Sequence, residues 1–166
     1  MQFPDKIYII GGAGSGKSTL AREISEIKHI PHFDTDDIMR FKKYTDKLTV
    51  EQRTHKLHTT ILKKYDKRVI EWFSIDRADE CYKQADLVIV LNVSKFTVAW
   101  RIFKRYISRI IHWDFTETFR WMLWLIQRAM NYQNPKHVHS LRRHIEDCKK
   151  YKCNYIIIRS AKEILE

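Results

Sequence analysis

The sequence predicts an α/β fold in which an open parallel sheet is covered by helices on both faces. Short apolar runs rich in β-branched residues alternate along the chain with longer stretches whose apolar residues recur at helical spacing. Parallel strands need a crossover between them, usually a helix, so this alternation favours a parallel sheet. The chain has 166 residues, of which 44% are apolar, and this is enough to bury the core of one domain.

The first part of the chain predicts three strands and the helices between them. The strands are short apolar runs at residues 6–10, 30–33 and 69–72. The helix after the first run begins near Ser18, and its apolar residues at helical spacing are Leu20, Ala21, Ile24 and Ile27. Residues 38–66 are polar and basic, and the inner face of a helix there is marked by Leu57, Ile61 and Leu62.

The second part of the chain predicts two more strands, at residues 86–92 and 155–158, which gives a sheet of about five. Ser94 is the expected N-cap of a helix. This helix carries Phe96, Trp100, Phe103, Tyr106, Ile107 and Ile110. Two further helices are expected at about 115–130 and 137–151, separated at Pro135, and a short helix at 161–166 follows the last strand.

A glycine-rich loop joins the first predicted strand to the first predicted helix. Residues 11–18 match the phosphate-binding pattern G-x-x-x-x-G-K-[ST], in the strand–loop–helix context that the pattern requires. Backbone N–H groups of such a loop surround a phosphate, and the positive end of the following helix faces it. The residues expected to bind the nucleotide are Gly12, Ala13, Gly14, Ser15, Gly16, Lys17, Ser18 and Thr19. Within this set, Lys17 should reach the β- and γ-phosphates of ATP, and Ser18 should offer its hydroxyl to Mg²⁺.

The net charge of the chain is +11, and most of the excess lies in its second half. Residues 1–100 hold 17 basic and 14 acidic side chains, whereas residues 101–166 hold 14 and 6. A basic half predicts an anionic ligand or partner: nucleotide phosphates, nucleic acid or a membrane surface.

Nothing in the sequence predicts a membrane span or a secretory signal. No apolar run is long enough to cross a bilayer, and the start of the chain lacks a basic stretch followed by an apolar one. The three cysteines have neither an even count nor zinc spacing. Free thiols and a cytoplasmic location are therefore expected.

Besides the glycine-rich loop, three further segments resemble segments of a known protein family. They are residues 33–40 (Phe-Asp-Thr-Asp-Asp-Ile-Met-Arg), residues 85–94 running on to 100–105, and residues 155–164. With the loop, they make the chain resemble the nucleoside-monophosphate-kinase-like P-loop kinases over nearly its whole length. Within that group the chain is most similar to the small bacterial adenylate-kinase-related proteins called DNA topology modulation proteins.

This resemblance implies a three-layer P-loop NTPase fold with a helical lid, and one kinase-like domain over residues 1–166. An acceptor-side insert would lie at about 36–66, and the lid with a helical insert at about 101–135. The implied activity is ATP-dependent phosphoryl transfer from MgATP to a small acceptor, such as a nucleoside monophosphate. Because residues 34–36 also resemble the shikimate-kinase pattern, an acceptor hydroxyl is equally open.

Positive charge near the transferred phosphate is expected from a pair of arginines. Arg101 and Arg105 are four residues apart, so they share one helix face. By the resemblance they match the lid arginines, one near the adenine and phosphates and the other on the transferred phosphate. With Lys17 and Asp34 they form the expected catalytic set, and Arg101 is also assigned to the nucleotide. Arg109, Arg120 and Arg128 continue this run of basic residues. The alternative interpretation is that the run is a solvated basic stripe on the helix surface.

Carboxylates after the second and third predicted strands are the candidates for the acceptor and the metal. Asp34 could orient or deprotonate an acceptor hydroxyl, and Asp36 and Glu71 join Ser18 as candidates to hold Mg²⁺ directly or through water. Acceptor contacts are expected from Asp34, Asp36, Arg40 and Glu71. The alternatives are that the acids favour a helix start at 37–43 and that Arg40 is a surface residue.

The chain departs from the family pattern at Glu71 and the next residue. The family usually has Asp followed by Gly where this chain has Glu71 and Trp72. We expect the bulky Trp72 side chain to stand where an acceptor would approach.

An aromatic segment flanked by arginines covers residues 113–132. Its members are Trp113, Phe115, Phe119, Trp121, Trp124 and Tyr132. The favoured interpretation is packing of the 115–130 helix on the lid helix, which would bury Phe119, Leu123 and Ile126. A homodimer surface and a nucleic-acid or membrane surface are the alternatives. Trp121 and Trp124 should share one helix face.

The competing function is that of a nucleotide-binding regulatory or nucleic-acid-associated P-loop ATPase without a small acceptor. The basic second half allows it, but the sequence shows no recognisable helix-turn-helix, zinc finger or RNA-binding aromatic pair. The eight histidines form no metal-binding pattern, and His55, His58, His137 and His139 are expected to be surface or packing residues. The sequence therefore favours a kinase that uses ATP and Mg²⁺.

Overall fold

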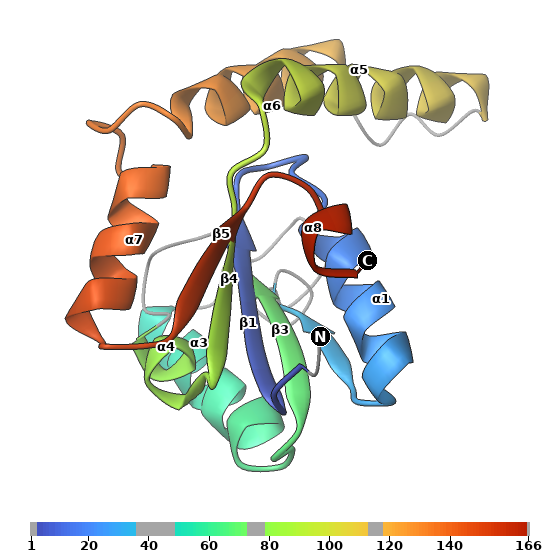
Figure 1. Ribbon diagram of the computed structural model, residues 1–166. Coiled ribbons are helices and arrows are strands. Elements are labelled where there is room, and N and C mark those ends of the chain that lie inside the picture. Colours follow the sequence, from blue (N-terminus) through green and yellow to red (C-terminus); the bar gives the residue numbers. More distant parts are fainter. Residues whose placement is uncertain (1–2, 36–48, 73–78, 113–117, 166) are drawn as a thin grey trace.

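The protein is described from a computed structural model, whose described residues are 3–35, 49–72, 79–112 and 118–165. In that part of the chain, five parallel strands form one sheet in the order β2-β3-β1-β4-β5 (Figure 1). The strands are β1 (Lys6–Gly11), β2 (His32–Asp34), β3 (Arg68–Trp72), β4 (Leu87–Leu91) and β5 (Tyr155–Ile158). The predicted α/β fold with a parallel sheet is confirmed.

Helices cover both faces of this sheet and its carboxyl edge. They are α1 (Lys17–Lys28), α3 (Val50–Leu57), the π-helical turn η1 (His58–Leu62), α4 (Asp79–Gln84), α5 (Lys95–Ile111), α6 (Phe119–Asn131), α7 (Leu141–Lys150) and α8 (Lys162–Leu165). One face is covered by α1 and α8, and the other by α3, η1, α4 and α7 (Figure 1). None of these described helices is long and apolar enough to cross a membrane.

The strand sequences explain the two cores. Residues alternate between the faces of a strand, so Ile7 and Ile9 of β1 join the apolar cluster under α1, whereas Tyr8 and Ile10 join the cluster under α4 and α7. Both sets are buried. A strand that is apolar on both sides is the form expected in a parallel sheet with two covered faces.

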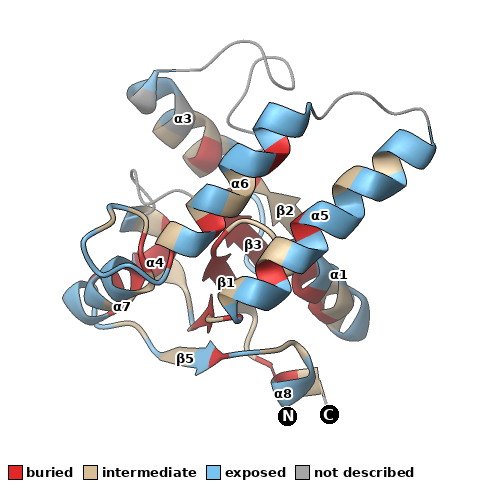
Figure 2. Ribbon diagram, turned by 90° about the horizontal axis from the view of Figure 1, so that it is seen from above, coloured by how far each residue is buried: buried red, intermediate tan, exposed pale blue. Residues whose placement is uncertain are grey.

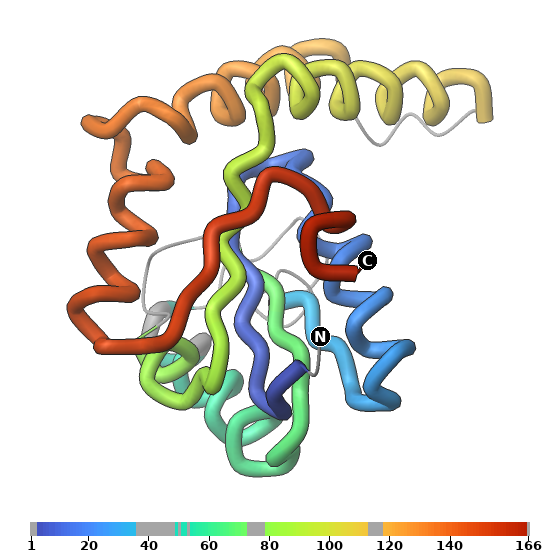
Figure 3. Tube along the Cα trace, in the orientation of Figure 1, coloured from blue at the N-terminus to red at the C-terminus, as the bar shows by residue number. Residues whose placement is uncertain are grey.

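The helices α5 and α6 form an antiparallel pair above the carboxyl ends of the strands. Figure 3 follows the chain from β4 up through α5, back through α6 and down through α7 to β5. Seen from above (Figure 2), α5 and α6 lie side by side over the sheet, and exposed residues make up most of their outer surface. The outer side of this pair is therefore largely uncovered by the other described residues.

The packing of α6 on α5 is confirmed, and Ile126 is partly buried against the core as expected, but the expectation is wrong for Phe119 and Leu123. Phe119 and Leu123 are 57% and 48% exposed, whereas Met122 and Ala129 are buried. The helices α5 and α6 are apolar on more than one side, and in each helix it is the side facing the sheet that is buried. Trp121 and Trp124 do share a face, since their rings stack with centroids 4.7 Å apart.

The beginnings of α6 and α7 are set by capping side chains. Thr118 accepts a hydrogen bond from the backbone N–H of Trp121 at 3.2 Å, and Ser140 accepts one from that of Arg143 at 3.3 Å. Such caps satisfy N–H groups that have no partner inside the helix. Both helices therefore begin about four residues later than the spacing of apolar residues predicts.

Candidate active site

The glycine-rich loop between β1 and α1 has the backbone shape of a phosphate cradle. Gly14 and Gly16 have backbone φ values of 71° and 95°, which residues other than glycine rarely adopt. Gly16 caps α1 without a side-chain hydrogen bond, and no acidic residue lies in the first turn. The positive end of α1 therefore opens toward the loop, as anion binding requires.

The two cations expected at the phosphates both contact this loop. The Lys17 Nζ donates to the carbonyl oxygen of Gly12 at 3.0 Å, and an Arg101 guanidinium N–H donates to that of Ser15 at 3.0 Å. The structure thus brings Arg101 from α5 to a loop 86 residues earlier in the sequence. Arg105 lies one turn further along α5 and is exposed.

The α5–α6 pair covers the loop so closely that its glycines have no room for a side chain. A Cβ atom on Gly14 would lie 2.9 Å from Ile102, and one on Gly12 would lie 3.1 Å from the ring of Tyr132. Tyr132 is buried at the end of α6, and within the described chain its hydroxyl has no hydrogen-bond partner. The sequence places Tyr132 only in the aromatic segment, so its contact with the loop is a finding of the structure.

A buried carboxylate stands beside the loop at the carboxyl end of β3. The Ser18 hydroxyl donates to Glu71 Oε2 at 2.7 Å, and His32 Nε2 lies 2.9 Å from Glu71 Oε1. Glu71 is buried, and Asp34 is its register partner on β2. Paired residues of parallel strands point to the same face, so the two carboxylates belong to one side of the sheet.

This oxygen pair fits a magnesium ion. Mg²⁺ is usually held by one or two carboxylates together with substrate phosphates and water, and Ser18 and Glu71 present a hydroxyl and a carboxylate next to the phosphate cradle. No group of three or more His, Cys, Asp or Glu residues that could hold a metal occurs in the described ranges. The donor set therefore suits an ion that arrives with a nucleotide rather than one in an all-protein cage.

Two of the expectations for the acceptor side lie outside the described residues, and a third, which concerns Trp72, stays a prediction. Asp36 and Arg40 fall between 36 and 48, where the structure is not described. Trp72 is buried in the apolar cluster with Ile61 and Tyr82. The reason is the alternation of strand side chains, since Trp72 and Glu71 point to opposite faces of β3.

His32 is a site residue that the sequence reasoning missed. It is mostly buried, and its side chain reaches diagonally from β2 to the Glu71 carboxylate of β3, two residues beyond its register partner Val69. The available signal was its spacing, because His32 and Asp34 are two apart on one strand and so share a face. Thr35 strengthens this junction, since its hydroxyl donates to the backbone oxygen of Glu71 at 2.9 Å.

A buried histidine of α7 lies beside the rings of Tyr82 and Tyr132. His144 Nδ1 is 3.2 Å from the hydroxyl of Tyr82, and in the described chain its Nε2 has no hydrogen-bond partner. Burial, followed by the positive charge of Lys17 and the nearby His139, lowers the pKa of His144 to about 3. His144 is therefore neutral at neutral pH, and it adds no positive charge beside Lys17.

His144 should make the protein less stable at mildly acidic pH. Its folded pKa of about 3 lies below the unfolded value of 6.5, so below pH 6.5 the unfolded state binds a proton that the folded state does not. The free energy of unfolding should fall by about 1–2 kcal/mol between pH 7 and pH 5 through this group. Urea denaturation of the wild type and of His144→Gln measures it, and an equal pH dependence in both proteins would contradict the assignment.

Glu71→Gln tests the magnesium assignment. The substitution keeps the shape and the contact with Ser18 but removes the charge, so the Mg²⁺ concentration for half-maximal turnover should rise about 10- to 100-fold. Asp86→Asn is the matched control, because that carboxylate accepts from the Lys6 backbone N–H at the opposite end of the sheet. A magnesium dependence in Glu71→Gln that matches the control would remove Glu71 from the metal site.

The cysteines offer no nucleophile among the described residues. Burial raises the pKa of the Cys81 thiol to about 12 and also raises the pKa of the half-buried Cys153, and Cys148 is buried in the apolar cluster under α7. A thiolate is the reactive form of cysteine. The candidate residues for chemistry are therefore those of the loop, its cations and the carboxylates.

Comparison with known proteins supports the fold. No protein-family model and no curated protein matches the sequence. Among solved structures, the chain is similar to a gluconokinase from Sinorhizobium meliloti 1021, with 18% identity, coverage of 99% of this chain and 89% of that chain, and a TM-score of 0.55. It is also similar to the shikimate kinase of Acinetobacter baumannii in complex with shikimate, with 15% identity, coverage of 97% and 90%, and a TM-score of 0.57. The chain therefore has the fold of these P-loop kinases.

Proposed function

We propose that this protein transfers a phosphoryl group from MgATP to a small acceptor. The observation that carries the proposal is the convergence on one loop of Lys17, Arg101 and the Ser18–Glu71 pair. Phosphoryl transfer needs positioned positive charge and a bound metal more than it needs a covalent nucleophile. The site offers cations and oxygen ligands in that combination.

The nucleotide would occupy the loop and the beginning of α1. Backbone N–H groups of residues 12–19 would bind the phosphates, and Lys17 would leave the Gly12 carbonyl to reach the β- and γ-phosphates. Arg101 would hold both loop and phosphates, and Arg105 would act on the transferred group. Mg²⁺ bound by Ser18 and by Glu71, directly or through water, would neutralise charge on the phosphates.

The acceptor would lie beyond the carboxyl ends of β2 and β3. Asp34 would orient or deprotonate its hydroxyl, and Asp36 and Arg40 are proposed as further contacts. The proposed division of this single domain places an acceptor-side insert at 36–66 and a lid with a helical insert at 101–135. We also propose that the chain belongs with the adenylate-kinase-related proteins called DNA topology modulation proteins. The neighbours' names, gluconokinase and shikimate kinase, support a small-molecule acceptor.

A nucleotide-dependent regulatory protein that binds nucleic acid is the second candidate. It is favoured by one observation, which is that α5 and α6 contain seven basic residues and no acidic one. Binding through such a surface would weaken steeply between 50 and 200 mM salt. A kinase with a small acceptor would respond far less.

The rate of ADP release separates the two candidates. Pools of small acceptors should raise the release of ADP from MgATP several-fold at both 50 and 200 mM salt if the protein is a kinase. Stimulation by single- or double-stranded DNA, lost at the higher salt and absent with small molecules, would instead support the regulatory protein.

We infer that a second copy of the chain covers the exposed side of the 113–132 segment. Within its described part, Phe119, Leu123 and Met130 are exposed on one side of α6. Light scattering should give the mass of a dimer for the wild type and for the control Ile27→Glu, which alters an exposed apolar residue of α1. Leu123→Glu should give a monomer, and a wild-type monomer at micromolar concentration would refute the dimer.

A further inference from the structure

The carboxylate of Glu71 is held at both of its oxygens. His32 Nε2 lies 2.9 Å from Oε1, and the Ser18 hydroxyl donates to Oε2 at 2.7 Å. Because an ionised carboxylate only accepts hydrogen bonds, the Nε2 atom of His32 carries the proton of its contact. One oxygen is thus bound from β2 and the other from α1.

The two neighbours of this carboxylate come from different elements on one side of the sheet. His32 is opposite Val69 in the register, and Val69 is buried in the apolar cluster under α1. Residues two apart on a strand share a face, so Glu71 projects to the same side as Val69. The histidine therefore reaches the carboxylate from the edge strand β2, and the serine reaches it from the first turn of α1.

Burial gives the hydrogen bond from His32 its importance. Glu71 is buried and His32 is mostly buried, so bulk water contributes little to the hydration of the carboxylate. A buried polar group that lacks a partner costs free energy. The terminal torsion of a glutamate side chain is otherwise broad. The contact with His32 therefore restricts the rotation of the carboxylate and keeps Oε1 on the β2 side.

The main chain of Glu71 is held by the same end of β2. Thr35 directly follows that strand and is buried, and its hydroxyl donates to the backbone oxygen of Glu71 at 2.9 Å. His32 and Thr35 thus fix the side chain and the backbone of one residue. This end of β2 therefore locates Glu71 at two points.

We propose that His32 is a positioning residue of the magnesium site. By donating to Oε1 of Glu71, it keeps Oε2 turned toward Ser18 at the phosphate loop, where Glu71 would hold Mg²⁺ directly or through water. Partners of this kind orient the groups that hold a metal. The inference rests on the proposed function, and it gives His32 a role in that function without contact with the nucleotide or the acceptor.

Two substitutions separate the hydrogen bond of His32 from its packing. His32→Leu keeps an apolar side chain in the space but removes the donor, whereas His32→Gln keeps an N–H donor. EPR titration of free Mn²⁺, with the full chain in excess over ADP, gives the dissociation constant of Mn²⁺ from the protein–ADP complex. Mn²⁺ can replace Mg²⁺ because both suit octahedral oxygen ligands. The constant should rise about 10- to 100-fold in His32→Leu, and His32→Gln should recover most of the wild-type affinity.

A double substitution tests whether His32 acts through Glu71. In the Glu71→Gln background, His32→Leu should change Mn²⁺ binding by less than about twofold, because the charge that His32 positions is already absent. In the Asp86→Asn background, His32→Leu should have its full effect. Asp86 suits this control because its carboxylate accepts from the Lys6 backbone N–H at the opposite end of the sheet.

Three results would overturn the positioning role. The first is an equal Mn²⁺ affinity of His32→Leu and the wild type, or no recovery in His32→Gln. The second is an equal effect of His32→Leu in the two backgrounds, since His32 would then act without Glu71. The third is weaker binding of ADP to His32→Leu in the absence of metal, measured by calorimetry, because His32 would then support the loop itself. We expect equal binding of metal-free ADP to all variants.

Failure of this inference can be told apart from failure of the proposed function, because the titrations need no phosphoryl transfer. The expected Mn²⁺ pattern without a phosphorylated product from any acceptor would refute the kinase and leave the role of His32 intact. A product formed from MgATP, together with Mn²⁺ binding that does not depend on His32, would refute that role alone.

Discussion

Replacing Lys17 with alanine is expected to lower the rate of phosphoryl transfer by about 10²–10³-fold or more, while the fold remains intact. The ammonium group of Lys17 lies at the loop, 3.0 Å from the carbonyl oxygen of Gly12, where it can follow the charge of the phosphates. Its side chain is not part of either apolar cluster, so its loss opens no cavity. Turnover of MgATP and the melting temperature should be measured together.

Lys83→Ala is the matched control for this substitution. Lys83 is an exposed lysine of α4 that pairs with Glu80 at 3.1 Å, and it belongs to no part of the proposed site. It should leave turnover unchanged. Wild-type turnover in Lys17→Ala would remove the loop lysine from the mechanism, and a large fall in melting temperature would show a structural role instead.

Arg105→Ala is the second substitution expected to have a large effect. A cation that meets the transferred phosphate in the transition state lowers kcat when it is lost, by about 10²–10³-fold, and changes the dissociation constant of MgATP little. Arg101→Ala should differ. Because Arg101 also donates to the Ser15 carbonyl, its loss should weaken MgATP binding as well as turnover.

Lys104→Ala provides the comparison on the same helix. Lys104 is exposed and adjacent to Arg105, but it lies on another side of α5. Steady-state kinetics and nucleotide titration of Arg101→Ala, Lys104→Ala and Arg105→Ala should therefore give three different combinations of kcat and MgATP dissociation constant. If Arg105→Ala weakened MgATP binding as strongly as it lowered kcat, Arg105 would be a ground-state contact only.

Much of the fold follows from local signals in the sequence. Four of the five strands coincide with short apolar runs, whereas β2 (His-Phe-Asp) has one apolar residue, and the loop pattern fixes where β1 ends and α1 begins. Ser18 and Glu71 could also be named as magnesium candidates from their residue types and positions. Their contact at 2.7 Å joins residues 53 apart in sequence, so it depends on the order of the strands in the sheet.

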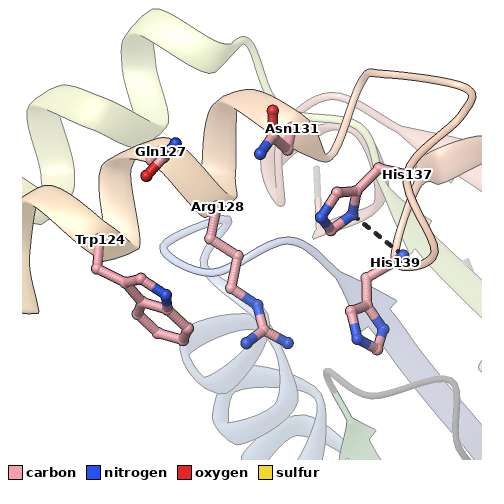
Figure 4. A pocket seen from close by; sticks show the side chains of 6 residues that line it. All are labelled: Trp124, Gln127, Arg128, Asn131, His137 and His139. Atoms are coloured by element: carbon pink, nitrogen blue, oxygen red, sulfur yellow. Dashed lines mark hydrogen bonds between the residues drawn. The ribbon is translucent and has the colours of Figure 1, made fainter.

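Other parts of the site depend on packing that no local pattern encodes. α5 is apolar on two sides, and only the assembled structure shows that Val98 and Ile102 face the loop while Phe96 and Trp100 stay 73% and 63% exposed. His137 and His139 carry no recognisable motif. They come to line a small pocket together with residues of α6 such as Trp124 and Asn131 (Figure 4), because the chain after α6 turns back beside that helix.

The most direct test of the central claim is a phosphorus NMR spectrum of MgATP with the protein and pooled acceptors. The pools would be nucleoside monophosphates, nucleosides and hydroxylated metabolites, with Lys17→Ala run in parallel. The account predicts ADP together with a new phosphorylated product that is absent with Lys17→Ala. ADP and inorganic phosphate as the only products, formed at the same rate with and without every pool, would contradict it.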